Sequence, residues 1–124
     1  MPLVVDVPQC VLRVPVPPSA NNLFTNAQTG RSYGRHKSAK YQDWLHDAGW
    51  EVKRQAGSLH FTKPGLRVLI EIDLPRQRDM DNAIKPLLDL LVYTHIFADD
   101  SLVDDLRIVR RGSKSEAAVS IWPS

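Results

Sequence analysis

The spacing of apolar residues changes abruptly in the middle of the chain. The run LRVLIEIDL, residues 66–74, is rich in branched residues that alternate with polar ones, and Pro75 follows it. Beyond this proline, apolar residues recur at three- and four-residue steps up to about Tyr93. Alternation is typical of a strand, whereas the wider spacing is typical of a helix. The sequence therefore predicts a central strand that leads into a helix, with the segment RDMDNAIK, residues 78–85, between them.

The start of this predicted helix is marked by its first apolar residue. The apolar face begins near Ile84, so Asp81 or Asn82 is the expected N-cap. Pro86 lacks the N–H that an interior helical residue donates, and we expect it within the first turn, where that donor is not needed. An aspartate that serves as an N-cap would be an ordinary structural explanation for an acidic turn here.

Two further elements are expected before this unit. Alternation over residues 10–16 indicates a strand, and its prolines favour a place at the edge of a sheet. After a long loop, Ser38 is the expected N-cap of a helix that runs to about Ala56, with Gly57 as its stop. The apolar positions of this helix are Tyr41, Trp44, Leu45, Ala48 and Val52.

The C-terminal part is predicted to be a β-hairpin, in which residues 102–110 and 117–122 are strands around the turn RGSK. The expected element order is therefore strand, long loop, helix, strand, helix, strand, strand. The predicted fold class is α+β. Residues 1–124 are expected to form one small domain, with a mixed β-sheet packed against two main helices.

Composition restricts the class of protein. A chain of 124 residues with 43% hydrophobic residues is long enough for one compact domain with a small core. No apolar run approaches the roughly 20 residues that cross a bilayer, and Asp6 stands where a secretory signal would have basic residues. We therefore expect a cytoplasmic protein without a membrane partner. Cys10, the single cysteine, excludes an internal disulfide and is expected to pack as a small apolar residue.

Positive charge gathers in the N-terminal third, where the chain from Val7 to Gln42 has no Asp or Glu. The basic residues of this stretch are Arg13, Arg31, Arg35, Lys37 and Lys40. Such a stretch suits contact with a phosphate backbone, although an ordinary solvated loop has the same composition. The candidate DNA-binding residues are Arg31, Arg35, Lys37 and Lys40, together with Arg76 and Arg78 beside the acidic turn.

Two acidic segments, RDMDNAIK and FADDSLVDD, carry the candidate chemistry. Asp79 and Asp81 are two residues apart, and ionised carboxylates this close repel each other unless a cation compensates. An EF-hand is excluded, because Ile84 stands where its loop needs glycine and Leu90 where it needs glutamate. If the two segments meet in space, their carboxylates and Lys85 indicate a magnesium site open to phosphate. The alternative is a solvated acidic turn in which Lys85 only forms ion pairs along the helix.

The patterns R-D-x-D-N-x-x-K-P-x-L-D-x-L and F-x-D-D-S-x-V resemble the RusA family of Holliday junction resolvases. The segments VPPSANNLF and KSAKYQDW also resemble the N-terminal motif and first helix of that family, so the similarity spans nearly the whole chain. Two details differ from the family pattern. Leu102 stands where many relatives have glutamine, and THIF stands where a glycine is common.

This resemblance implies a function and the residues that carry it. It makes Asp79, Asp81 and Asp100 metal-binding catalytic carboxylates and Lys85 an essential catalytic residue, with Asp99 as a further candidate. The implied cofactor is Mg²⁺, with Mn²⁺ as a substitute, which would activate a water molecule and neutralise charge on the scissile phosphate. The resemblance also implies a homodimer that resolves four-way DNA junctions by symmetric paired nicks, in DNA recombination and repair.

Two other functions remain open. One is a non-catalytic module that binds branched DNA and whose acidic turns are structural. The other is a metal-dependent phosphotransferase that acts on small molecules. The basic stretch and the absence of a G-x-x-x-x-G-K-[ST] loop from the sequence argue against the phosphotransferase.

The aromatic residues and the histidines are given structural interpretations. Trp44 is expected in the core, and Trp50 and Trp122 are expected to be half-buried, because aromatic residues in helices and strands mostly pack. Phe24 is expected to pack against the core from its loop, and the alternative is a wedge between unpaired bases. The four histidines share no spacing that indicates a zinc site.

Overall fold

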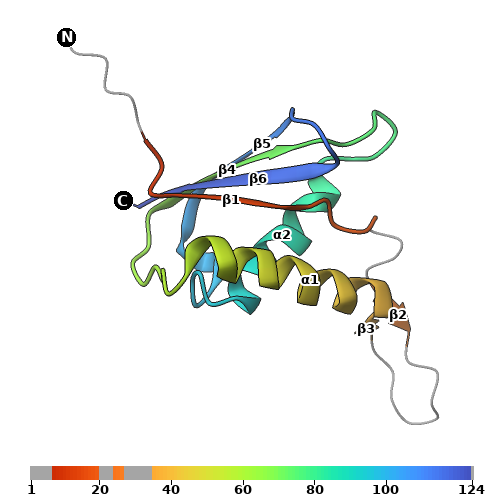
Figure 1. The fold of residues 1–124 in the computed structure, drawn as a ribbon, viewed down its shortest axis with the longest axis horizontal. Coiled ribbons are helices and arrows are strands. Elements are labelled where there is room, and N and C mark those ends of the chain that lie inside the picture. Colours follow the sequence, from red (N-terminus) through yellow and green to blue (C-terminus); the bar gives the residue numbers. More distant parts are fainter. Residues whose placement is uncertain (1–6, 20–23, 27–34, 124) are drawn as a thin grey trace.

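The computed structural model of the protein describes residues 7–19, 24–26 and 35–123. The strands of its main sheet are β1 Cys10–Pro15, β4 Leu66–Ile72, β5 Val103–Arg110 and β6 Glu116–Trp122, and its helices are α1 Ala39–Ala56 and α2 Asp81–Tyr93. The strand order is β1-β6-β4-β5, and both helices cover one face of the sheet (Figure 1). This arrangement confirms the α+β class, the mixed sheet and the edge position of β1. No helix in the described ranges has the length and apolar character needed to span a bilayer.

The core lies between the sheet and the helices, because every second residue of a strand points to the same face. Val68, Ile70 and Ile72 of β4 are each at most 2% exposed, whereas Arg67 points to the open face. The predicted alternation of this central strand is therefore confirmed. Cys10 is buried as well, as an apolar residue would be, and burial raises the pKa of its thiol.

β4, α2 and β5 form a crossover unit in which the two strands are parallel. β5 begins beside the start of β4, with Val103 near Leu66, and ends beside the end of β4, with Arg110 opposite Ile72. Helix α2 therefore runs back from the end of β4 toward the start of β5. The turn before α2 and the segment after it consequently lie at opposite ends of the sheet.

The predicted C-terminal hairpin is wrong, although both of its strands are present. β6 pairs antiparallel with β1 and with β4, so β4 separates it from β5. The connection between β5 and β6 crosses the end of β4. There the backbone N–H of Arg111 donates to the carbonyl of Ile72 at 3.0 Å, and the backbone N–H of Asp73 donates to the carbonyl of Glu116 at 3.1 Å. Gly112, with φ of 118°, provides the turn. Alternation along each strand identifies the strand but not its neighbours in the sheet.

Helix α1 has the ends that its sequence predicts. Ser38 is the N-cap, and its Oγ accepts the N–H of Tyr41 at 3.1 Å. Gly57 ends the helix with φ of 62° and donates its N–H to a carbonyl of the last turn. Trp44 is in the core, as predicted, at 8% exposure. Its Nε1 donates to the carbonyl of Pro15 at 2.9 Å, which ties α1 to β1.

Helix α2 begins differently from the prediction. Its N-cap is Met80, not Asp81 or Asn82, and the Met80 side chain makes no capping hydrogen bond. Met80 already has helical φ and ψ of −65° and −37°, and its carbonyl accepts the N–H of Ala83 at 3.0 Å. Pro86 therefore falls beyond the first turn, contrary to the prediction, and cannot donate to the carbonyl of Asn82. The helix continues past it because the buried face packs into the core.

Two short strands lie in the region predicted as one long loop. β2 Phe24–Asn26 pairs antiparallel with β3 Arg35–Lys37 in a separate two-stranded sheet. Strands of three residues are too short to produce a clear alternation, so the sequence pattern does not reveal them. Phe24 begins β2, but its side chain lies outside what the structure describes, and both interpretations of it stay predictions.

Candidate active site

The first acidic segment lies beyond the end of β4, where Asp79 and Asp81 are both exposed. Two arginines hold the backbone of this turn. Arg110, the last residue of β5, donates from Nη2 to the carbonyl of Arg78 at 2.6 Å. The guanidinium group of Arg78 in turn donates from Nη2 to the carbonyl of Pro17 at 3.1 Å. The turn is thereby fixed to one end of the sheet and to the segment after β1.

The second acidic segment forms the short helix η2, Asp100–Leu102, which leads into β5. Asp99 is its N-cap, with Oδ1 accepting the N–H of Ser101 at 3.2 Å. This backbone hydrogen bond is the main cause that lowers the pKa of the Asp99 carboxyl. The carbonyl of Leu102 accepts the N–H of Gly65 at 3.1 Å, which places η2 beside the start of β4. Asp99 thus has a structural role, and Asp100 is exposed beside it.

An open cleft of about 530 Å³ lies along α2 and reaches η2 and β3. Its lining residues are Lys37, Lys85, Asp89, Val92, Tyr93, Asp99 and Asp100. Of the predicted catalytic residues, Lys85 and Asp100 share this cleft, and the predicted DNA-binding residue Lys37 joins them. Asp79 and Asp81 are not among the lining residues. The structure therefore brings together part of the predicted site.

Lys85 contacts another residue of its own helix. Its Nζ lies 3.6 Å from Oδ1 of Asp89, one turn further along α2, and the Lys85 side chain is 67% exposed. The other oxygen of Asp89 accepts the hydroxyl of Tyr41 at 2.7 Å. This ion pair is the structural alternative that the sequence offers for Lys85. An exposed pair contributes only about 0–1 kcal/mol, so the ammonium group remains available to a phosphate.

The predicted carboxylates suit Mg²⁺ in their chemistry but not in their arrangement within one chain. Hard cations prefer oxygen ligands, which Asp79, Asp81 and Asp100 provide. Among the residues that the structure describes, however, no three histidine, cysteine or acidic side chains are grouped so that they could hold a metal ion. The crossover explains this result, because the first two aspartates follow β4 and the third precedes β5. One chain by itself does not bring the two acidic segments into a common pocket.

The other predicted DNA-binding residues have different surroundings. Lys40 is exposed in the first turn of α1, and Arg76 is exposed in the loop after β4. Arg78 is half-buried, and its guanidinium group supports the acidic turn as described above. Arg35 lies in β3, where only the backbone is described, and Arg31 lies outside the described residues.

A second groove adjoins the cleft and contains two exposed aromatic residues. Trp50 is 68% exposed, so the prediction that it is half-buried is wrong, and Tyr93 is 51% exposed. Together with His46, Gly49 and Lys53 they line a groove of about 460 Å³. Tyr93 also lines the cleft, so the two hollows are neighbours. The sequence carried a signal for this, because Trp50 falls outside the three- and four-residue spacing of the apolar face of α1.

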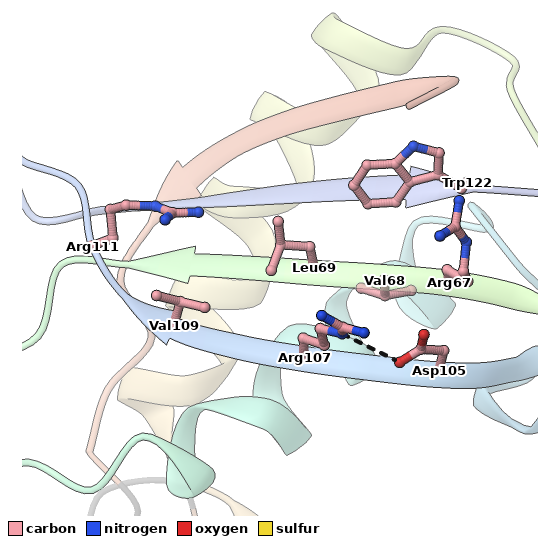
Figure 2. Close-up of a pocket in the computed structure, with 8 residues that line it drawn as sticks. All are labelled: Arg67, Val68, Leu69, Asp105, Arg107, Val109, Arg111 and Trp122. Carbon is pink, nitrogen blue, oxygen red and sulfur yellow. Dashed lines mark ion pairs between the residues drawn. The ribbon is translucent and has the colours of Figure 1, made fainter. Parts of the chain in front are cut away.

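The open face of the sheet has a hollow of its own. Figure 2 shows arginine and tryptophan side chains standing on β4, β5 and β6 there. The guanidinium group of Arg67 lies 5.3 Å from the centre of the Trp122 ring, and Arg107 pairs with Asp105 at 3.8 Å. Trp122 is half-buried, as predicted. The residues that line this hollow include none of the predicted catalytic residues, so it is separate from the candidate active site.

Similarity to known proteins extends over most of the chain. Residues 15–122 match the protein family described as Endodeoxyribonuclease RusA. The crossover junction endodeoxyribonuclease rusA of Enterobacteria phage HK97 is 34% identical over 99 residues, which cover 78% of this chain and 78% of that protein. The crossover junction endodeoxyribonucleases RusA of Escherichia coli O139:H28 and strain K12 are 30% and 29% identical over 115 residues, covering 88% of this chain and 92% of each relative. The resemblance seen in the sequence is therefore confirmed, and the chain belongs to the RusA family of endodeoxyribonucleases.

Proposed function

We propose that this protein is a structure-specific endodeoxyribonuclease that cleaves four-way DNA junctions. The family match over residues 15–122 carries the proposal, because it includes both acidic segments and because the relatives are named as crossover junction endodeoxyribonucleases. The cleft supports it as well, since Lys37, Lys85 and Asp100 line the same open surface. Lysines in an open cleft suit the phosphate backbone of DNA, which is the main source of affinity in such complexes.

The predicted catalytic residues and Lys37 each have a role in this function. Lys85 is one helical turn from Asp81 and lines the cleft with Asp100, so it is the residue that contacts the phosphate of the cleaved strand. Lys37 binds the same backbone from β3. Asp79, Asp81 and Asp100 are the proposed ligands of Mg²⁺, with Mn²⁺ as a substitute, because carboxylate oxygens are the ligands that hard cations prefer.

The proposal includes a homodimer with two active sites. A four-way junction has two-fold symmetry, and its resolution needs paired nicks in strands of like polarity. A dimer with the same symmetry presents two identical sites to these strands, whereas a single site nicks only one of them. The proposed setting is DNA recombination and repair in the cytoplasm.

A non-catalytic module that binds branched DNA is the second candidate function. Two contacts favour it, because Asp99 caps η2 and Lys85 pairs with Asp89, so charged residues at the cleft have structural partners. The start of α2 argues against it. The N-cap there is Met80, so the acidic turn is not explained by Asp81 capping the helix.

The substitution Asp81→Asn distinguishes the two candidates. We expect the variant to lose junction cleavage by about 10²-fold or more, and to bind the junction at least as tightly, because a negative charge near the phosphates is removed. Cleavage is measured on labelled four-way junctions with and without Mg²⁺, beside Y-shaped and linear duplexes. Asp47→Asn, which removes an exposed carboxylate from α1, is the matched control. A wild-type cleavage rate in Asp81→Asn would contradict the nuclease proposal.

A further inference from the structure

The groove between α1 and the end of α2 holds two aromatic side chains that the fold does not use. Among the described residues, the large apolar side chains that are exposed are Val7, Val11, Trp50 and Tyr93. The last two line the same groove of about 460 Å³. An exposed aromatic ring leaves apolar surface in water, which is unfavourable. Two such rings in one hollow therefore indicate a surface that a ligand or partner covers.

Helix α1 holds one of these rings in place. Gly49 is buried within this helix, where a glycine weakens the helix relative to alanine. A Cβ atom at Gly49 would lie 3.2 Å from Cε2 of Tyr93, so the missing side chain lets the tyrosine ring lie directly against α1. Trp50 is the next residue of the same helix. The ring of Tyr93 is thereby supported from α1, so that a ligand meets a surface that is already formed.

The charge of the groove favours a ligand that carries phosphate. Its polar side chains are His46 and Lys53, and no acidic residue of the described chain is among those that line it. Asp47 lies beside the groove, and its Oδ1 is 3.5 Å from Nδ1 of His46. Tyr93 also lines the cleft, where Lys85 is the proposed contact of the DNA backbone. A DNA strand that follows the cleft therefore reaches this groove.

A nucleobase suits the groove better than a second copy of the chain. Complete burial of both rings would cover only about 300 Å², whereas a stable protein interface needs about 800 Å² on each partner. Aromatic rings beside a basic groove are the usual means of holding single-stranded nucleic acid, because every base has a flat face that stacks. Within a duplex, neighbouring bases cover both faces of each base. The groove can therefore stack only a base that has left its pair.

We infer that Trp50 and Tyr93 stack an unpaired base of the DNA strand whose phosphates lie in the cleft. This inference rests on the proposed function and names the feature of the substrate that this surface recognises. Unpairing a base costs least where pairing is already disturbed, as it is at a branch point. The groove thus favours branched and single-stranded DNA over a linear duplex.

Substitutions at Trp50 test the stacking. Fluorescence anisotropy in EDTA measures binding without cleavage, with a labelled oligothymidine strand, a linear duplex and a four-way junction as probes. We expect Trp50→Ala to weaken binding of the single strand by about 10-fold and to leave the affinity for the linear duplex unchanged. Trp50→Phe should keep most of the affinity for the single strand. Trp50→Leu should behave like Trp50→Ala, because it keeps apolar bulk but has no ring.

Val11→Ala is the matched control, because it removes an exposed apolar side chain from β1, away from the groove, and should bind all three probes as wild type does. Wild-type affinity for the single strand in Trp50→Leu would overturn the stacking. Equal losses for the single strand and the linear duplex in Trp50→Ala would also overturn it.

Photo-cross-linking tests the contact directly. A four-way junction with 5-iododeoxyuridine at the branch point is bound in EDTA and irradiated, and the protein is digested and analysed by mass spectrometry. We expect the DNA adduct on Trp50 or Tyr93, since iodouracil couples to aromatic side chains that touch it. Adducts found only on other residues would overturn the base site.

The outcomes separate this inference from the proposed function. A wild-type protein that cuts junctions, while Trp50→Ala binds every probe as wild type does, overturns the base site and leaves the nuclease intact. Binding of the single strand that depends on Trp50, in a protein that cuts no junction, supports the base site and overturns the proposed function. If Trp50→Ala changes the mass measured by light scattering but not the affinity for DNA, a second copy covers the groove and the base site is wrong.

Discussion

The two acidic segments are held in place by different means. Distant residues fix the first segment, since Arg110 of β5 donates to the backbone carbonyl of Arg78 and the Arg78 guanidinium group donates to the carbonyl of Pro17. In the second segment Asp99 caps its own turn, and the carbonyl of Leu102 accepts the N–H of Gly65 beside the start of β4. An aspartate is thus used for structure in the second segment, whereas the helix after the first begins without a side-chain cap. Neighbouring carboxylates in one motif can therefore have separate roles, and Asp100 is the functional candidate of its pair.

The largest effect is expected at Lys85, the last residue of the first segment, which lines the cleft with Asp100. Lys85→Gln should lower cleavage by about 10²–10³-fold, because the proposed contact of its ammonium group with the phosphate is lost. The free energy of unfolding should change by less than about 1 kcal/mol, since the Lys85 side chain is exposed and Asp89 keeps its hydrogen bond from Tyr41. Single-turnover cleavage and urea denaturation measure the two effects, with Lys63→Gln as the exposed control. Lost stability with unchanged cleavage would show that the residue is structural.

An intermediate effect is expected from the clamp on the first segment. Arg110→Ala removes the donor to the Arg78 carbonyl and should cost about 1–3 kcal/mol of stability. Displacement of the acidic turn should also slow cleavage by about 10-fold or more. Arg111→Ala is the control, because that exposed arginine pairs with Glu71 on the surface and should cost about 0–1 kcal/mol. If Arg110→Ala cleaves normally, the clamp does not position the site.

The smallest effect is expected at the cap of the second segment. Asp99→Ser keeps an oxygen that can accept the Ser101 N–H and should cleave nearly as wild type, whereas Asp99→Ala should be a few-fold slower. The pKa of Asp99 is lowered from 3.8, so its stabilising contribution is complete above that pH and is lost as the pH falls further. An NMR titration of the carboxyl carbon should therefore have its midpoint below 3.8. An effect of Asp99→Ala as large as that of Asp100→Ala would remove the distinction between them.

Local features of this molecule were predictable, and features that depend on neighbours were not. Ser38 and Gly57 end α1 as expected, because capping is decided by a few adjacent residues. The hairpin prediction failed because β4, which is distant in sequence, inserts between β5 and β6. The start of α2 was missed by one or two residues, since Met80 adopts helical angles without a polar side chain.

The candidate site follows the same division. Its residue types and spacing were evident from the sequence, and the shared cleft of Lys85 and Asp100 agrees with them. The distance between Asp81 and Asp100 depends on the direction of β5 relative to β4, which alternation within a strand does not encode. The exposure of Trp50 was predictable from the sequence. Trp50 lies off the apolar face of α1 that the three- and four-residue spacing defines.

Asp89 has two partners at the cleft, the ammonium group of Lys85 and the hydroxyl of Tyr41. Burial, and then the nearby Asp89, raise the pKa of Tyr41, so the phenol keeps its proton and continues to donate to that carboxylate at neutral pH. When Lys85 turns from Asp89 to a phosphate, the carboxylate retains this second donor. In the proposed function, a DNA phosphate that replaces Asp89 as the partner of Lys85 therefore leaves the hydrogen bond between Tyr41 and Asp89 in place.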